Sequence, residues 1–377
     1  MFVHTRSRPG RAHPRRGIAR QGVALLATTI LALTAALTGA TPAQAAVPDR
    51  WGFAYLQTAT PAPGTILDTT RQWGGWMTSM PGVWATVDQI GVGRYRVYFP
   101  GTASRNGVAH VTAVDNAPRW CQVFQTYPSG SNQIVEVQCY RPGGAPDNAR
   151  FVVDYTSASG VLPPGSDAFG YVKANPVGAL MSSYNSAGAG NTVAQLGTGI
   201  YEVRLNGLGT ALLDGNLQAT AEHPNLPRRC KIARWGSSGG TILAYVFCFD
   251  AAGAMADSLF HLTYHRQRPI FGAVGPPKHF AYLWTPALGG ATDFNSAGGV
   301  NTIFGSGLGM YLVTHTLVGY RMTTVQVTAF GPRPDYCNLQ EPWIVSGTTV
   351  YIRNVVCFNA AGAQAPNDFF LTYSSNI

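Results

Sequence analysis

The sequence predicts an all-β protein made of three tandem antiparallel β-sandwich or jelly-roll modules, each with one disulfide. Three observations indicate this fold class. One stretch of sequence recurs three times, and six Cys fall in pairs within the three copies. Apolar and polar residues alternate along short segments rich in Val, Thr, Tyr and Phe, as in strands with one buried face. The 44 Gly and 25 Pro fit many short strands joined by tight turns.

The recurring stretch predicts a strand, a glycine turn and a second strand. Each copy has Gly at +5, Ala at +6 and large apolar residues at +12, +14 and +16 from a Cys at position 139, 248 or 357. Spacing by two places these apolar residues on one face of a strand. A Gly-x-Tyr sequence and a Thr-Ala pair precede the Cys in the same order in every copy. Such internal repetition predicts three modules, at residues 46–158, 167–265 and 279–377.

The first 45 residues are predicted to be a secretory signal peptide. Six Arg precede an apolar run from Val23 to Leu37, and Ala43-Gln44-Ala45 has the small-x-small pattern of a cleavage site. We therefore expect a secreted, extracellular protein, and no second apolar run is long enough for a membrane anchor. Removing the six Arg leaves 20 Lys+Arg against 17 Asp+Glu, a net charge of +3. This near balance does not indicate a nucleic-acid partner.

The six Cys predict one disulfide in each module. Export favours disulfides, and two thiolates without a nearby His do not complete a zinc site, so we expect no metal and no cofactor. Each bridge closes a loop of roughly 20 residues, which is worth about 3 kcal/mol by loop entropy. The predicted pairs are Cys121 with Cys139, Cys230 with Cys248, and Cys337 with Cys357.

Two proline-rich segments, Ser159–Ser166 and Arg266–Lys278, are predicted to join the modules as semi-rigid spacers. The sequence leaves two questions open. The modules could form a string or close into a pseudo-threefold cluster. The first module, which departs most from the other two, could be degenerate or specialised.

The order of motifs resembles repeats of secreted proteins from high-GC Gram-positive bacteria. The shared pattern is Gly-x-Tyr, then Val-Thr-Ala, a Cys, an aromatic residue, Cys-Phe-Asp-x-x-Gly and Phe-x-x-x-Tyr. It covers nearly all of the chain after the predicted signal peptide. The Gly-x-Tyr strand start also resembles jelly rolls of the complement C1q type. The resemblance implies a β fold and carries no function with it.

Aromatic residues give the candidate binding site. Trp73, Trp76 and Trp84 in the first module have no counterparts in the other two, and exposed aromatic rings suit sugar faces or protein partners. The alternative is that they fill a local core. Tyr127, Trp235 and Trp343 recur five or six residues after the first Cys of their modules, and we expect each ring to pack over the disulfide.

Three polar patterns have a catalytic or metal-binding interpretation beside a structural one. Residues 236–240 match the Gly-x-Ser-x-Gly spacing of a nucleophile elbow, or are a polar hairpin tip. His261 and His265 would lie about 13 Å apart on a strand, so we expect surface or edge histidines and no shared ion. Asp250 and Asp257 flank a glycine turn and either cap their own backbone or contribute to a calcium site.

Together these observations predict a non-catalytic, exported three-module protein that binds a polysaccharide, a cell-wall polymer or an extracellular protein. Repeated modules raise avidity for repetitive targets. No polar constellation recurs in all three copies, as an active site built into the module itself would require. Two alternatives stay open. One is a hydrolase or lyase acting on extracellular polymers, with Ser238, His223 and Asp214 as candidate residues. The other is a protease inhibitor that presents the hairpin tips.

Overall fold

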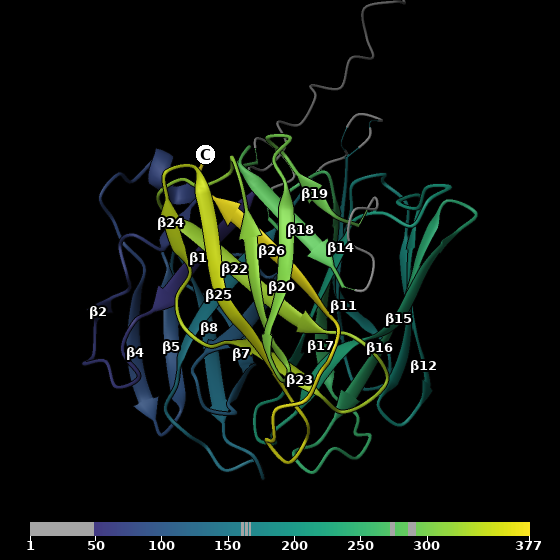
Figure 1. Cartoon of the computed structure of the whole chain (residues 1–377), viewed down its shortest axis with the longest axis horizontal. Coiled ribbons are helices and arrows are strands. Elements are labelled where there is room, and N and C mark those ends of the chain that lie inside the picture. Colours follow the sequence, from purple (N-terminus) through teal and green to yellow (C-terminus); the bar gives the residue numbers. More distant parts are fainter. Residues whose placement is uncertain (1–48, 160–161, 163–164, 166, 272–275, 286–291) are drawn as a thin grey trace, which may run out of the picture. The chain divides into compact units, whose positions relative to one another are not determined.

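The fold contains strands and loops, with one short helical turn, η1 (Gly75–Thr78), in the described part of the chain. The computed structural model describes residues 49–159, 162, 165, 167–271, 276–285 and 292–377 (Figure 1). The predicted signal peptide lies outside these residues, as do parts of both predicted spacers. The all-β prediction is confirmed.

The first module is a sandwich of two antiparallel sheets. One sheet has the order β3 (Gln72–Gly74), β1 (Arg50–Leu56), β9 (Arg150–Ser157) and β6 (Val108–Val114). The facing sheet has the order β2 (Thr65–Ile66), β4 (Thr86–Gly91), β5 (Arg94–Phe99), β8 (Asn132–Tyr140) and β7 (Trp120–Ser129). Inward-facing residues of both sheets, such as Val97, Phe99 and Val153, form one buried core.

The second module repeats this architecture. Its first sheet has the order β11 (Leu180–Asn185), β10 (Ala168–Ala174), β17 (Leu259–Arg266) and β14 (Asn216–Glu222), and β14 pairs in parallel with β7, so that this sheet is continuous with the second sheet of the first module. Its second sheet has the order β12 (Asn191–Gly197), β13 (Ile200–Asn206), β16 (Thr241–Phe249) and β15 (Arg229–Ser238).

The third module follows the same plan and is drawn in green to yellow in Figure 1. Its first sheet has the order β19 (Phe294–Asn295), β18 (Phe280–Trp284), β26 (Phe369–Ser375) and β22 (Thr323–Ala329). Its second sheet has the order β20 (Asn301–Gly307), β21 (Met310–His315), β25 (Thr349–Phe358) and β23 (Tyr336–Leu339), and β24 (Ile344–Ser346) also pairs with β25. Strand β23 pairs in parallel with β6, so that this sheet is continuous with the first sheet of the first module.

All three predicted disulfides are present. Each joins two Cys that face each other on neighbouring antiparallel strands, with Cα–Cα distances of 4.0 to 4.1 Å. Each bridge therefore fastens a hairpin within one sheet of its own module.

Equivalent backbone hydrogen bonds join each module to the next and close a ring. The acceptor is always the carbonyl oxygen two residues after the first Cys, and the donor lies two residues after the Thr-Ala pair of the neighbouring module. The first module thus binds the second, the second binds the third, and the third binds the first. The bonds run from His223 N to Val123 O (3.1 Å), Gly331 N to Ile232 O (2.9 Å), and Asp115 N to Leu339 O (2.8 Å). The modules form a pseudo-threefold cluster and not a string.

The Thr of each Thr-Ala pair forms a second, buried ring of contacts between modules. Thr112 Oγ1 donates to Gln326 Oε1 at 2.6 Å, and Thr328 Oγ1 donates to Gln218 Oε1 at 2.8 Å. In the third position Thr220 Oγ1 lies 3.1 Å from Nδ1 of His110. A hydroxyl recurs at this point because each one satisfies a polar group of another module.

The glycine of the recurring turn also serves the contact between modules. Gly144, Gly253 and Gly362 have φ angles of 82°, 91° and 83°, which favour glycine. A Cβ atom added to Gly144 would lie 2.6 Å from the Cβ of an Ala in the second module, and one added to Gly253 would lie 2.8 Å from the Cβ of an Ala in the third module. A Cβ atom added to Gly362 would lie 2.4 Å from a proline ring carbon of the first module. The three turns therefore pack in a ring, each tip against the next module.

Candidate functional site

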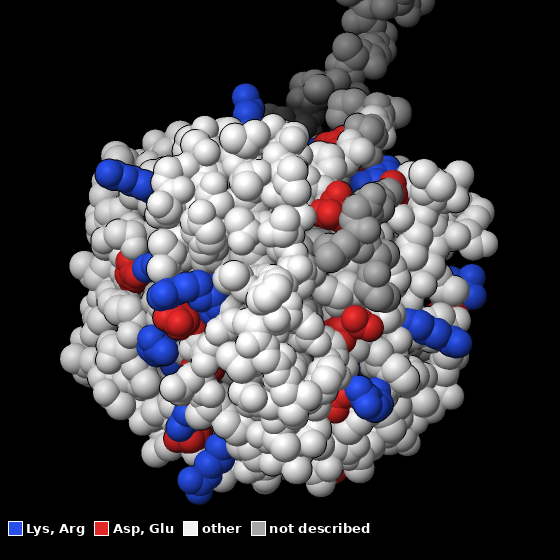
Figure 2. All heavy atoms as spheres, viewed as in Figure 1, with Lys and Arg blue, Asp and Glu red and all other residues white. Residues whose placement is uncertain are grey.

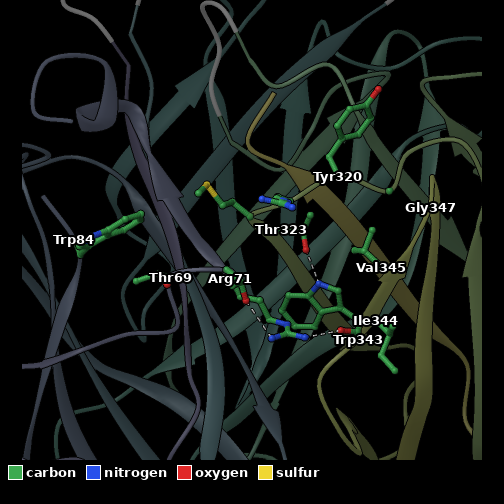
Figure 3. Close-up of a pocket in the computed structure, with 13 residues that line it drawn as sticks. Thr69, Arg71, Trp84, Tyr320, Thr323, Trp343, Ile344, Val345 and Gly347 are labelled. Carbon is green, nitrogen blue, oxygen red and sulfur yellow. Dashed lines mark hydrogen bonds between the residues drawn. The ribbon is translucent and has the colours of Figure 1, made fainter. Parts of the chain in front are cut away.

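A cavity of about 770 Å³ lies where the first and third modules meet (Figure 3). The first module contributes residues from the segment before β3 and from the loop before β4, and the third contributes the segment before β22 and the hairpin that contains β24. The lining residues are Thr69, Thr70, Arg71, Trp84, Gly319, Tyr320, Arg321, Met322, Thr323, Trp343, Ile344, Val345 and Gly347.

Trp343 is a fixed part of the cavity wall. Its side chain is buried, its Nε1 donates a 2.6 Å hydrogen bond to Thr323 Oγ1, and its ring centre lies 6.1 Å from that of Tyr55 in the first module. Burial raises the pKa of the Tyr55 phenol, so this wall is neutral at ordinary pH. Of the three recurring rings that we expected over the disulfides, Trp343 thus meets an aromatic partner in a neighbouring module, whereas the hydroxyl of Tyr127 donates to Glu136 Oε1 of its own module at 3.0 Å. Trp235 behaves in the same way as Trp343, against Trp284 and Phe370.

Arg71 crosses from the first module to the third. Its Nη1 lies 2.8 Å from Asp68 Oδ2, and its Nη2 donates to the carbonyl oxygen of Trp343 at 2.9 Å. The guanidinium carbon is 5.6 Å from the ring centre of Trp343, within the range of a cation–π contact. These contacts fix a cation at the edge of the cavity (Figure 3).

The rest of the cavity rim carries aromatic and polar groups that have fewer partners. Trp84 and Tyr320 are half-buried, and the Tyr320 ring centre lies 3.9 Å from that of His279. Arg321 is exposed, and no ion pair or hydrogen bond holds its side chain within the described residues. Met322 has a φ angle of 57°, a left-handed conformation that costs on the order of 1–3 kcal/mol for a non-glycine residue. Backbone strain of this kind is concentrated at functional sites.

The matching position between the first and second modules has a smaller cavity, of about 160 Å³. Its lining includes two cations, Arg105, which is exposed, and Lys173. Lys173 is held 2.8 and 2.9 Å from the two carboxylate oxygens of Glu222 and donates to Thr126 at 3.0 Å. The cavity between the first and third modules is thus the larger of the two, and no acidic residue is among its described lining residues.

The structure separates the three tryptophans predicted as a platform. Trp76 is 3 % exposed, and its Nε1 donates to Val83 O at 2.8 Å, so its ring belongs to the core. Gly74 makes room for it, because a Cβ there would lie 1.8 Å from the indole. Trp73 and Trp84 are both half-buried against the same core, and Trp84 also lines the cavity. The local-core alternative therefore describes Trp76, whereas ligand binding by Trp73 and Trp84 stays a prediction.

The candidate catalytic serine lies in a hairpin turn. Ser238 ends β15 and pairs with Thr241, and Gly239 and Gly240 form the turn with φ angles of 56° and 77°. A strand follows the turn, whereas a nucleophile elbow requires a helix, so that interpretation is wrong and the polar hairpin tip is correct. His223 Nδ1 accepts hydrogen bonds from two backbone N–H groups of its own turn, and the backbone oxygen of Asp214 accepts one from Tyr264.

The prediction that His261 and His265 lie at the surface or at an edge is wrong. Both side chains are fully buried on β17. His261 Nδ1 accepts from the backbone N of Ala109 in the first module at 2.7 Å, and its Nε2 lies 2.6 Å from Glu222 Oε2. Burial lowers the pKa of His261, and it lowers the pKa of His265 to about 3. A face that a single module would leave in water is covered once the ring of modules closes.

Of the two carboxylates beside the glycine turn, Asp250 caps its own backbone as expected, whereas Asp257 binds the backbone of the hairpin between β12 and β13. Asp250 Oδ1 accepts from Ala254 N at 2.9 Å, and Asn359 Oδ1 binds the matching Ala363 N at 3.0 Å. Asp257 Oδ1 accepts from Gly199 N at 2.6 Å. Within the described ranges, no group of three or more His, Cys, Asp or Glu side chains could hold a metal ion.

Sequence reasoning missed Arg71, Tyr320, Arg321 and Met322 as members of one site. They converge only when the first and third modules meet, and the sole signal was the divergence of the first module around Trp84. Comparison of the chain with protein-family models, curated proteins and solved structures gave no match. The resemblance to secreted bacterial repeats therefore stays a prediction. In the described part of the chain, no helix is both long and apolar enough to cross a bilayer.

Proposed function

We propose that this is a secreted, non-catalytic binding protein, and that the cavity between the first and third modules holds a segment of a polysaccharide or cell-wall polymer. The observation that carries the proposal is the set of groups around one cavity: the rings of Trp84 and Tyr320, the cations Arg71 and Arg321, and several Thr hydroxyls. Aromatic faces pack against the apolar faces of sugar rings, while guanidinium and hydroxyl groups bind their oxygens.

The chemistry of the lining favours binding over hydrolysis. Glycoside hydrolysis ordinarily needs two carboxyl groups about 5 to 9.5 Å apart. The described residues that line the cavity include no Asp, Glu, His or Cys. The three disulfides support an oxidising compartment, as expected for an exported protein.

Affinity electrophoresis in native gels that contain xylan, hydroxyethyl cellulose or glycol chitin tests the proposal, together with sedimentation on purified peptidoglycan. We expect at least one polymer to retain the protein, and Trp84→Ala and Arg321→Ala to weaken that retention about tenfold or more. Tyr245→Ala and Arg204→Ala are matched controls, because both side chains lie in the second module and neither lines the cavity.

Three results would contradict this function. The first is the absence of binding to all four polymers. The second is release of sugars from the bound polymer, which would favour the hydrolase or lyase alternative. The third is stoichiometric inhibition of a secreted protease in a titration, which would favour the inhibitor.

A further inference from the structure

The outer face of the sheet β20–β21–β25–β24 in the third module carries exposed apolar side chains on β20, β25 and β24. Across the sheet, Ile344 pairs with Tyr351, and Tyr351 pairs with Thr314. In the next row Phe304 pairs with Leu312. Phe304 is 68 % exposed, Tyr351 39 % and Ile344 38 %. We call this set the outer face of the third module.

One position of this face, that of Leu312, is charged in the other two modules, which provides an internal comparison. The residue after the Gly-x-Tyr sequence is Arg96 in the first module and Glu202 in the second, where the third has Leu312. Arg96 is bound by the buried carboxylate of Glu136 at 2.8 Å. Glu202 accepts hydrogen bonds from Arg204 and from Tyr245, both at 2.7 Å. The fold therefore does not require an apolar side chain at this position, and of the three modules the third has one there.

The outer face continues into the cavity. Ile344 belongs to the row that contains Tyr351 and also lines the cavity, next to Trp343. Figure 2 shows the view of Figure 1 in space-filling form, and the centre of that view, over β20, is largely free of charged side chains, whereas blue and red side chains lie toward β25. Arg353 on β25 is exposed but paired with Glu341 at 2.8 Å. A ligand that leaves the cavity along this route meets aromatic, aliphatic and hydroxyl groups.

The size of the outer face argues for a narrow ligand. The row from β24 to β20 crosses three strand spacings, or about 14 Å. A large side chain has a surface area of about 200 Å². With their exposed fractions, Phe304, Tyr351 and Ile344 therefore expose about 300 Å² in total. A stable interface with a second copy of the chain needs about 800 Å² per partner.

We propose that the outer face of the third module is a second part of the binding surface, on which an uncharged stretch of polysaccharide stacks its sugar rings as it extends from the cavity. This inference rests on the proposed function, because it assigns the polymer a path beyond the cavity. The rings of Phe304 and Tyr351 provide the stacking surfaces, and Thr302 and Thr314 provide hydroxyl groups between them. The chemical class is a neutral polysaccharide longer than the cavity itself.

The test compares the double variant Phe304→Ser/Tyr351→Ser with the wild-type protein on the polymers named above. We expect retention to fall about tenfold or more. The matched double variant Leu196→Ser/Tyr245→Ser removes exposed side chains from the corresponding sheet of the second module, and we expect it to bind like the wild type. Equal melting temperatures of the variants would show that folding is unchanged.

The outcomes separate this inference from the proposed function. If Trp84→Ala loses binding while Phe304→Ser/Tyr351→Ser retains it, the outer face takes no part and only the inference is overturned. If the wild-type protein binds none of the polymers, the proposed function fails and the inference fails with it. If sedimentation velocity shows a dimer that the Phe304→Ser/Tyr351→Ser variant dissociates, the face belongs to a second copy of the chain, and the inference is overturned.

Discussion

The hydroxyl group of Thr112 donates a 2.6 Å hydrogen bond to Oε1 of Gln326, which lies 214 residues further along the chain. The same hydroxyl accepts from the backbone N of Val327 at 3.0 Å. Both partners belong to the third module, so one small side chain of the first module satisfies two buried polar groups across their contact. The stability of the protein should therefore depend on contacts between modules as well as on each sandwich.

Thr112→Val keeps the shape of the side chain and removes both hydrogen bonds. It leaves Gln326 Oε1 and the N–H of Val327 without this partner, and we expect the free energy of unfolding to fall by about 1–3 kcal/mol. Urea titration followed by tryptophan fluorescence measures the change. Thr302→Val, at an exposed position, is the control and should cost much less. Equal effects of the two substitutions would mean that the Thr112 contact does not stabilise the fold.

Gly253→Ala tests the contact between neighbouring turn tips. The added Cβ would lie 2.8 Å from the Cβ of Ala360, at a φ angle of 91°. Gly143→Ala is a matched control, because Gly143 has a φ angle of 86° and open space around the position of the Cβ. We expect the free energy of unfolding of both variants to fall by about 1 kcal/mol, because Ala is strained at a positive φ angle. Gly253→Ala should lose about 1–3 kcal/mol more, because its Cβ overpacks the contact with Ala360. Identical melting temperatures for the two variants would argue against packing at the tips.

Acid should destabilise the protein through its buried histidines. Burial lowers the pKa of His265 and His315 to about 3, and it lowers the pKa of His110 and His261 as well. An unfolded His has a pKa of about 6.5. Below that pH the unfolded chain takes up protons that the folded chain does not. The contribution of these histidines to the free energy of unfolding therefore has its full value above pH 6.5 and decreases as the pH falls toward 3. Urea titrations at pH 7.5, 5.5 and 4.5 measure this slope, and a flat profile would contradict the buried placement.

Asp154 should act in the opposite direction. Its carboxyl group is buried, and burial raises its pKa to about 8, although the backbone N of His110 donates to Oδ1 at 3.1 Å. Its contribution to stability is full below the unfolded pKa of about 3.9 and is lost as the pH rises toward 8. We therefore expect Asp154→Asn to raise the free energy of unfolding by about 2 kcal/mol or more at pH 8, and to have little effect at pH 4. A stabilisation of equal size at both pH values would show that ionisation is not its cause.

The sequence predicted the features whose causes are local. The disulfide between Cys230 and Cys248 and the hairpin at Ser238 follow from spacing within one module, because strand alternation and turn residues act over a few positions. The burial of His261 does not follow from its own strand. It depends on the backbone N of Ala109, which lies 152 residues away and in another module.

The candidate site was only partly predictable for the same reason. Trp84 was identified because it has no counterpart in the other modules. Arg71 and Arg321 lie in segments that match no sequence motif, so neither was predicted as a site residue. The cavity that both residues line exists only where the first and third modules meet. The glycines of the recurring turn were identified as turn residues, whereas their contact with the next module required the structure.

The central claim is that the three modules close into a ring, and small-angle X-ray scattering of residues 46–377 tests it most directly. A compact body of 332 residues has a radius of gyration of about 20 Å. We predict a value close to this, with a single maximum in the distribution of interatomic distances. A radius well above it, with separate maxima for distances within and between modules, would indicate a string and would contradict the account.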